Sequence, residues 1–264
     1  MTTMRYLNSV EQRLKLMKIK QVADFNVAYL ITEYHLMMNE QMKQTKLFFD
    51  LEFTGLHKNT TIVSLGIVAD SGQTFYAEFT DYDKSQVNEW IQTNVIDKLT
   101  LLIPNLEFED YCGIDSRHDD NPTGTDLYKS YSCICQGTHE VIKPKLLQWL
   151  AQFESITMIG DVLAYDWVLF QSIFGTAFDM PSHINYIPVD ISTLMLVYGI
   201  PVDVNREEYL ISINPRLIPE GQKHTALYDA KVTQALYKEF VLADRDVDLN
   251  SAIVLSVDQA IERE

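Results

Sequence analysis

Cysteine and long apolar runs are what this sequence has least of. It contains three cysteines in 264 residues and no apolar run that approaches the length of a membrane span. Because so few cysteines do not suggest a disulfide framework, we expect the protein to lie in a reducing compartment, the cytoplasm. The N-terminus also lacks the apolar core and cleavage site of a secretory signal. These absences predict a cytoplasmic protein with no membrane partner.

Positive charge is scarce as well. The chain carries 21 lysines and arginines against 37 acidic residues, a net charge of −16. A protein that holds a long polyanion on its surface needs a basic footprint, and this one repels nucleic acid at long range. The charge leaves two alternatives. Either the chain binds no nucleic acid, or it contacts a short end through metal ions and a few local cations.

Residues 1–46 depart from this acidic character, with seven lysines and arginines against four acids. They also contain an apolar stripe at helical spacing, formed by Val27, Leu30, Ile31, Tyr34, Met38 and Met42. Such stripes indicate packing, so we expect a helical N-terminal extension that packs on the domain or on a second copy of the chain, as a homodimer. A basic arm that helps to hold substrate is the alternative. Residues 47–242 are predicted to form the main domain, and 243–264 a C-terminal tail.

The stretch Phe48–Phe53 has the composition of a strand, and Thr54-Gly55 ends it with turn chemistry. Asp50 and Glu52 lie two residues apart, so their side chains project to the same side. Neighbouring carboxylates repel each other and raise a pKa unless a positive charge lies between them, and a divalent cation is the usual remedy. The alternative is an exposed edge strand with two solvated acids, which the apolar flanks disfavour.

Residues 47–80 predict a three-stranded antiparallel meander with a hairpin at Asp70–Gly72. A short apolar strand at 156–160 and an extended segment at 186–189 follow, each leading into a helix. We therefore expect an α/β fold, a mixed five-stranded sheet of three antiparallel and then parallel strands, flanked by helices. Ser85 and Asp190 are predicted helix caps.

Residues 104–142 are rich in proline and glycine and predict a long loop or insertion. This stretch holds all three cysteines, Cys112, Cys133 and Cys135, together with His118 and His139. Cys133, Cys135 and His139 have the atoms for a zinc site, but their spacing is not that of a standard zinc knuckle. A surface excursion with small buried thiols is the preferred interpretation.

Three further residues join the candidate site. Asp166 lies just beyond the strand at 156–160, in the first turn of a helix, where the helix dipole favours a carboxylate that faces a cleft. A second helix is predicted from Thr225, with His224 just ahead of it and Asp229 one turn inside it. Taken singly, each acid reads as an ordinary first-turn acid and His224 as a surface histidine near a cap.

Taken in order, Asp50-x-Glu52, Asp166 and His224-x-x-x-x-Asp229 resemble the motifs of the DEDDh 3′–5′ exonuclease superfamily. This superfamily has an RNase H-like fold and includes proofreading exonucleases, oligoribonuclease and RNase T. The resemblance spans about 47–240, and it is strongest to small bacterial and phage 3′–5′ exoribonucleases. One departure concerns the second motif, where the residues ahead of Asp166 lack the usual His-Asn pair.

The resemblance implies a chemistry for these residues. Asp50, Glu52, Asp166 and Asp229 would hold two divalent cations, Mg²⁺ or Mn²⁺, with Asp50 bridging them, and His224 would take a proton from the attacking water. The expected reaction is hydrolysis at the 3′ end of single-stranded nucleic acid, with RNA favoured over DNA, which releases nucleoside 5′-monophosphates. A DNA exonuclease of the proofreading or repair type, and a non-catalytic binding module of the same fold, are the alternatives.

The resemblance also implies substrate-binding residues beside the first motif. Thr54 and Leu56 would contact the terminal sugar and wedge against the last base. Phe53 and Trp167 are candidate stacking surfaces for bases, and core positions are the alternative for both, preferred for Phe53.

Overall fold

The computed structural model describes residues 44–101 and 132–246. By its internal contacts the chain separates after Gln44, and the described residues from Thr45 onward belong to one compact unit. Residues 1–43 of the predicted helical extension lie outside the described residues, as do Cys112, His118 and most of the predicted tail. The predicted boundary at residue 46 is slightly late, because Thr45 and Lys46 already belong to the first strand. Within the described residues, every helix is too short or too polar to cross a bilayer.

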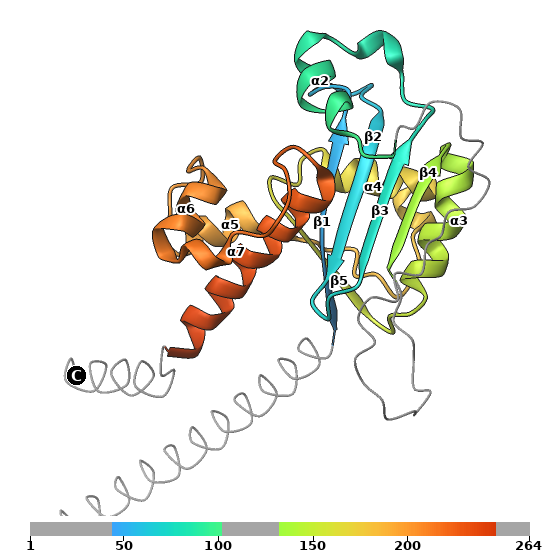
Figure 1. The fold of residues 1–264 in the computed structure, drawn as a ribbon. Helices are drawn as coiled ribbons and strands as arrows, with labels where there is room; N and C mark the ends of the chain where they lie inside the picture. The colour runs from blue at the N-terminus through green and yellow to red at the C-terminus, as the bar shows by residue number, and fades with distance from the viewer. Residues whose placement is uncertain (1–43, 102–131, 247–264) are drawn as a thin grey trace, which may run out of the picture. The chain divides into compact units, whose positions relative to one another are not determined.

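The described chain opens with three strands and ends with three α-helices, and strands and helices alternate between these two parts (Figure 1). The strands are β1 (Thr45–Phe53), β2 (Ile62–Ala69), β3 (Thr74–Phe79), β4 (Cys133–Gly137), β5 (Ile156–Gly160) and β6 (Val189–Asp190). The α-helices are α2 (Glu89–Asn94), α3 (His139–Leu150), α4 (Asp166–Phe174), α5 (Ile191–Val197), α6 (Arg206–Ile213) and α7 (Ala226–Asp246). Short 3₁₀ turns are η1 (Lys84–Gln86), η2 (Ile96–Lys98), η3 (Ala177–Asp179) and η4 (Pro215–Leu217).

The sheet is mixed and has six described strands in the order β4-β3-β2-β1-β5-β6. The pairs β1–β2 and β2–β3 are antiparallel, which confirms the predicted meander, and the pairs β1–β5, β5–β6 and β3–β4 are parallel. The α/β class is therefore confirmed, but the predicted number of five strands is wrong. The sixth strand is β4, which pairs with β3 inside the stretch predicted as an insertion.

That insertion also ends earlier than its composition suggests. Its last residues, predicted as loop, form β4 and the first turn of α3. Cys133 and Cys135 alternate with the exposed Ile134 along β4, and this period places both thiols in the core. The glycine and proline content of 104–142 was a poor guide here because β4 gains its stability from pairing with β3.

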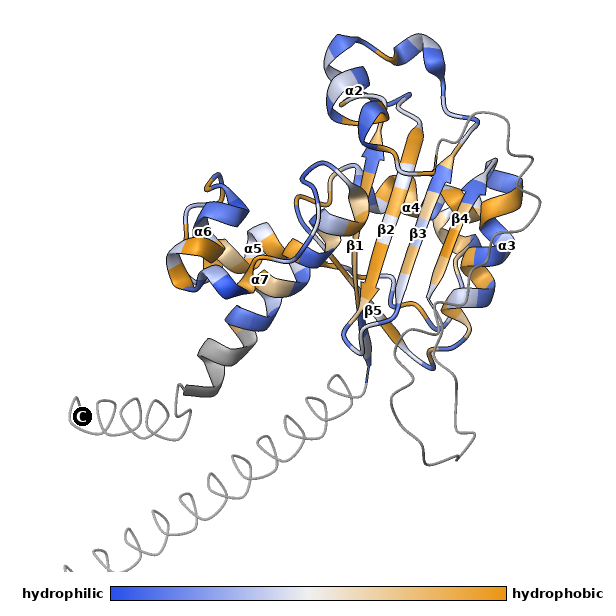
Figure 2. Cartoon of the chain, in the orientation of Figure 1, coloured by the Kyte–Doolittle hydropathy of each residue, from blue (hydrophilic) through white to orange (hydrophobic). Residues whose placement is uncertain are grey.

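The two faces of the sheet carry separate cores. Phe49 and Leu51 of β1 pack with α3 and α4, whereas Phe48 packs with α5, α6 and α7. This alternation is the period of two expected of a strand. β2 is hydrophobic almost throughout (Figure 2) and all of its residues are buried, because helices cover the sheet on both faces. Asp50 and Glu52 share their face with Phe48, so they point toward α7.

The predicted caps had mixed outcomes. Asp190 caps α5, with its Oδ1 accepting from the Ser192 N–H at 2.9 Å, as expected. Ser85 does not cap a helix. Asp83 caps η1 and Asn88 caps α2, where its side chain accepts from the Ile91 N–H. Both are residues that favour a cap, and the helix starts later than its apolar spacing indicated.

Candidate active site

The predicted acids meet in one cavity. Its volume is about 490 Å³, and it opens beside β1, between the β5–α4 turn and the start of α7. Among its lining residues are five that the sequence motifs singled out as catalytic: Asp50, Glu52, Asp166, His224 and Asp229. Residues separated by up to 179 positions therefore share one site.

Asp50 and Glu52 owe their direction to β1. In the register of the sheet, Asp50 lies opposite Gly66 and Glu52 opposite Ser64, both on β2. Gly66 lets α7 approach, because a Cβ there would lie 2.2 Å from the backbone nitrogen of Leu227. The missing side chain thus brings the first turn of α7 directly onto the strand beside Asp50.

Asp166 is the first residue of α4, as its sequence position indicated. Its Oδ1 accepts a hydrogen bond from the backbone N–H of Leu51 at 2.9 Å. This bond ties the carboxylate to the backbone of β1 between Asp50 and Glu52. The position of Asp166 in the cavity is therefore fixed by the strand as well as by the helix.

His224 and Asp229 enter from the start of α7. The backbone N–H of His224 donates to Asp229 Oδ2 at 3.0 Å, and His224 has a φ of 62°, in the left-handed region. One ligand atom each from Glu52, His224 and Asp229 lie within 4.8 Å of one another, a spacing that a metal ion could bridge. The two acids and the imidazole thus face a common point.

The electrostatics of the cavity are those of crowded, buried acids. Burial raises the pKa of Asp50 well above its ordinary value, and the charges of Asp166 and Glu52 add to the shift. Burial, and then Asp229, raises the pKa of Glu52 to about 8. The pKa values of Asp166 and Asp229 are raised to about 6 and about 7, again by burial first. Such a donor set fits divalent cations, which restore the charged form of each carboxylate.

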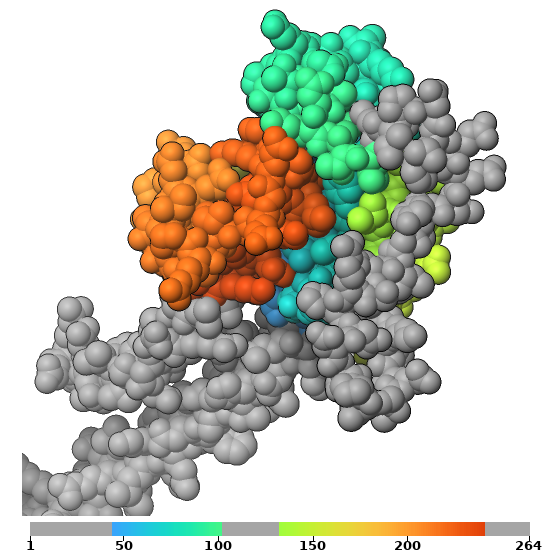
Figure 3. Space-filling model, viewed as in Figure 1, coloured from blue at the N-terminus to red at the C-terminus, as the bar shows by residue number. Residues whose placement is uncertain are grey.

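His224 lies under different influences. Its pKa is lowered from its ordinary value by burial and then by the positive charges of Lys223 and Lys98. The exposed ring of Trp90 packs edge-on against the imidazole, with ring centroids 6.0 Å apart. Figure 3 shows the segment that carries α2 meeting the start of α7 at the surface. The imidazole therefore packs against Trp90, and its lowered pKa favours the neutral form.

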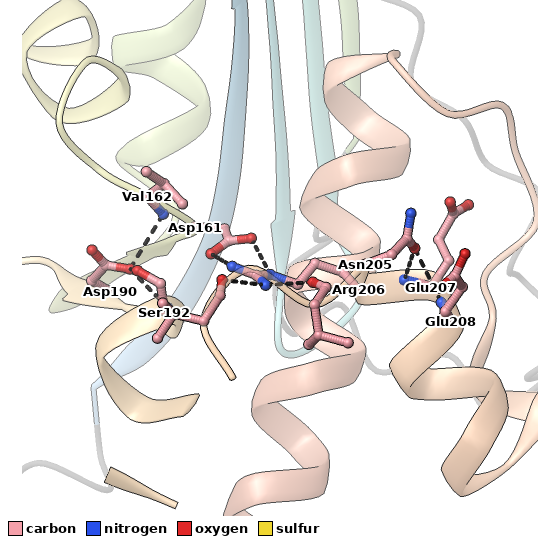
Figure 4. Close-up of polar contacts among 10 residues, drawn as sticks. Asp161, Val162, Asp190, Ser192, Asn205, Arg206, Glu207 and Glu208 are labelled. Atoms are coloured by element: carbon pink, nitrogen blue, oxygen red, sulfur yellow. Dashed lines mark hydrogen bonds and ion pairs between the residues drawn. The ribbon is translucent and has the colours of Figure 1, made fainter. Parts of the chain in front are cut away.

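Asp161 and Arg206 also line the cavity, and Figure 4 shows the contacts between them. Arg206 donates from Nε and Nη2 to the carboxylate of Asp161 at 2.7 and 3.0 Å, and from Nη1 to the carbonyls of Val202 and Val204 at 2.8 and 2.7 Å. Four of the five N–H donors of the guanidinium are thus engaged. Arg206 consequently fastens the loop before α6 to the end of β5.

Glu207, the next residue of α6, also lines the cavity. Its Oε1 accepts from the Tyr228 hydroxyl at 2.5 Å, and its Oε2 pairs with Lys223 Nζ at 3.1 Å. These two contacts lower the pKa of Glu207, with the hydrogen bond from Tyr228 as the largest cause. Glu207 is therefore a further charged acid at the site, set beside Lys223 and His224.

The predicted substrate-binding residues do not all reach the cavity. Phe53 lines it and stacks on Tyr165, with centroids 5.7 Å apart. Leu56 is 76% exposed in the turn after β1, outside the lining. Thr54 is 1% exposed, and its hydroxyl is engaged with Gln86, Thr60 and Thr61.

Trp167 is also outside the cavity lining. It packs against Phe49 and stacks on Phe170 in the core between the sheet and α4. The α-helical period turns it away from Asp166, one residue earlier. Among the residues described, its position supports the core interpretation, and its proposed role in stacking bases has no support from the geometry.

The zinc alternative has little support from the described residues. Cys133 and Cys135 are buried in the core, and His139 Nδ1 lies 3.0 Å from the Asp81 carboxylate while its ring packs on Phe79. Within the described part of the chain, the group of residues that could hold a metal is Glu52, His224 and Asp229.

Sequence reasoning missed Asp161, Arg206 and Glu207. Asp161 carried a signal, since it directly follows a strand whose carboxyl end faces the site. Arg206 and Glu207 carried a weaker one: Asn205 indicates a helix start, but nothing local says where that helix packs. Only the tertiary fold brings α6 to the cavity.

Comparisons with known proteins do not establish a family for this chain. No protein-family model matches the chain. Two curated 3′–5′ exoribonucleases of Mycobacterium tuberculosis, from strains CDC 1551 / Oshkosh and ATCC 25618 / H37Rv, are each 33% identical over 54 residues. That match covers 20% of this chain and 32% of each relative, so the chain spans about a third of their length.

A solved structure is also similar, the catalytic unit of Neurospora crassa Pan2, which comprises protease and nuclease domains. The identity is 16%, the TM-score is 0.37, and the match covers 79% of this chain and 29% of that one.

Proposed function

We propose that this protein is a metal-dependent 3′–5′ exonuclease that acts on single-stranded RNA. The observation that carries the proposal is the convergence of four acids and one histidine on a single cavity. The local identity to 3′–5′ exoribonucleases supports the direction of attack and the choice of RNA. DNA 3′ ends are the second candidate substrate.

Asp50, Glu52, Asp166 and Asp229 would hold two divalent cations, Mg²⁺ or Mn²⁺. When bound, these cations supply charge neutralisation at the leaving oxygen and at the attacking water. The raised carboxyl pKa values support this role, because the cluster binds protons in the absence of cations. His224 accepts the proton of the water on an imidazole nitrogen, which its lowered pKa keeps available near pH 7.

Labelled oligomers test the reaction and its substrate together. Matched RNA and DNA single strands, labelled at either end, are incubated with Mg²⁺ or Mn²⁺ and with EDTA. We expect 5′-labelled RNA to shorten one nucleotide at a time, nucleoside 5′-monophosphates to appear, and EDTA to stop the reaction. If DNA is shortened faster than RNA, DNA 3′ ends are the substrate. If neither strand is shortened with either metal, the proposed exonuclease function is wrong.

The variant Asp50→Asn tests the site itself. It removes one of the clustered charges at the centre of the metal cage, so hydrolysis should fall to background. The metal-free protein should be as stable as wild type or more so, because like-charge repulsion is relieved. Asp97→Asn, at a surface acid outside the cavity, is the matched control. Wild-type turnover in Asp50→Asn would mean that the cage lies elsewhere.

A further inference from the structure

An acidic cavity that takes a polyanion needs positive charge besides its cations, because the chain as a whole repels nucleic acid. Arg206 and Lys223 are the arginine and the lysine that line the cavity among the described residues. Arg206 is an unsuitable phosphate ligand, because its guanidinium already donates hydrogen bonds to Asp161 and to two backbone carbonyls. This leaves Lys223 to be considered.

Lys223 differs from Arg206 in its contacts and exposure. Its side chain is 44% exposed, and the ion pair with Glu207 at 3.1 Å engages one of the three N–H donors of the ammonium. The flexible stem of lysine lets the ammonium move without shifting the backbone. Lys223 can therefore turn into the cavity while the chain around it stays in place.

Glu207, the partner of Lys223, can lose this ion pair at little cost. Glu207 keeps its hydrogen bond from the Tyr228 hydroxyl when the lysine departs, and its side chain is 26% exposed, so its charge stays solvated. Loss of the lysine therefore leaves no buried, unpaired carboxylate, which would be costly. The pair is weak enough to exchange for a phosphate oxygen.

The position of Lys223 also suits the reaction. It precedes His224, and its charge lowers the pKa of the imidazole and of Asp229. Lys98, at the end of η2, acts on the same imidazole and lies outside the cavity lining. Of the two lysines that act on His224, Lys223 is therefore the one that lines the cavity together with the acids.

We propose that Lys223 binds a non-bridging phosphate oxygen of the substrate strand, and that it exchanges Glu207 for that oxygen when the strand enters. This inference rests on the proposed function and deepens it. Lys223 is in this view a strand-binding residue, and Glu207 with Tyr228 holds its ammonium at the cavity mouth in the absence of substrate.

Binding is measured on His224→Asn protein with Mn²⁺, so that turnover does not interfere. A fluorescent single-stranded oligoribonucleotide is titrated at several salt concentrations, against the same protein carrying Lys223→Met, Lys223→Arg or, as the matched control, Lys238→Met on the exposed part of α7. We expect Lys223→Met to weaken binding about tenfold, the loss of one charge-assisted hydrogen bond. Its salt slope should fall by about 0.7, the value for one phosphate on a single strand. Lys223→Arg should keep the slope, and Lys238→Met should match the unaltered protein.

Neutral methylphosphonate linkages, placed one at a time from the 3′ end, identify the phosphate. One of these linkages should weaken binding of the strand to the reference protein, His224→Asn. The same linkage should cause no further loss of binding in the protein that also carries Lys223→Met. Additive losses at every linkage, or an unchanged salt slope in Lys223→Met, would overturn the inference while the proposed function stands. If the reference protein binds no strand and the wild type shortens none, both fall together.

Discussion

At the scale of the residue, His224 combines a strained backbone conformation with a proposed role as the general base. Its φ of 62° is uncommon for a residue other than glycine, and costs free energy that the surrounding structure must offset. In return, its N–H meets Asp229, and its side chain reaches the acids of β1. The turn before α7 therefore sets both the histidine and the aspartate with one backbone conformation.

This conformation guides the choice of variant for the general base. Asn tolerates the left-handed region, so His224→Asn removes the imidazole and keeps the turn. We expect kcat to fall by about 10²–10⁴. In the wild type the rate should rise with pH through a pKa below 6.5, since a base must be neutral and the pKa of His224 is lowered. His224→Asn should lose that ascending limb.

The pH–rate profile of His139→Asn serves as the comparison. His139 also faces a carboxylate, that of Asp81, but it lies outside the cavity lining. Its variant should keep the wild-type profile. If His224→Asn keeps the ascending limb too, another group is the base.

At the scale of the element, the site depends on how closely α7 lies on β2. Gly66 is the point of contact, and a methyl group there would collide with the backbone of Ala226 and Leu227. Backbone atoms cannot move aside as a flexible side chain can. The helix must therefore shift as a unit, and Asp229 moves with it.

Gly66→Ala should accordingly weaken both the fold and the metal site. Overpacking costs about 1–3 kcal/mol, and each kcal/mol lowers Tm by about 2–4 °C in a domain of this size. Affinity for Mn²⁺, followed by calorimetry, should fall as well, because Asp229 is displaced from Asp50 and Glu52.

Ser64→Ala is the matched control on the same strand and face. The Ser64 hydroxyl is buried and has no hydrogen-bond partner among residues 44–101 and 132–246, so its removal should leave Tm unchanged or raise it. If Gly66→Ala has the same Tm as Ser64→Ala and binds Mn²⁺ with wild-type affinity, the close approach of α7 at Gly66 is not required.

At the scale of the whole molecule, the clustered acids link stability to pH and to cations. Their folded-state pKa values are raised, so the metal-free folded protein binds more protons than the unfolded chain does. By linkage, their contribution to stability is present at low pH and is lost as pH rises through the folded pKa values, from about 6 to about 8.

Metal-free protein should thus melt at a lower temperature at pH 8 than at pH 5.5, apart from any general acid denaturation. Mg²⁺ or Mn²⁺ should raise Tm at pH 8 and have less effect at pH 5.5, where protons compete for the carboxylates. Thermal scans in EDTA and in each cation measure this. Equal metal-induced shifts at both pH values would contradict the link between the acids and the cations.

The sequence by itself determined the meander, the class of fold and five of the residues that line the cavity. Local physics gives their directions, since a period of two turns Asp50 and Glu52 to one side and the starts of helices place Asp166, His224 and Asp229, and the resemblance of their order to exonuclease motifs brought the five together. It could not determine the strand β4, whose residues resemble a loop until β3 pairs with them. Nor could it place Trp167, since an aromatic side chain near a motif suits a base and a core equally well.

Tertiary structure decided the rest, because the remaining contacts join elements with no shared local pattern. The packing of α6 brings Arg206 to Asp161 and Glu207 to Lys223, residues that are 45 and 16 positions apart. Gly66 decides how near α7 lies, and the backbone of Leu51 decides where Asp166 points. Spacing along a chain specifies which face a side chain takes, and only packing specifies what lies opposite it.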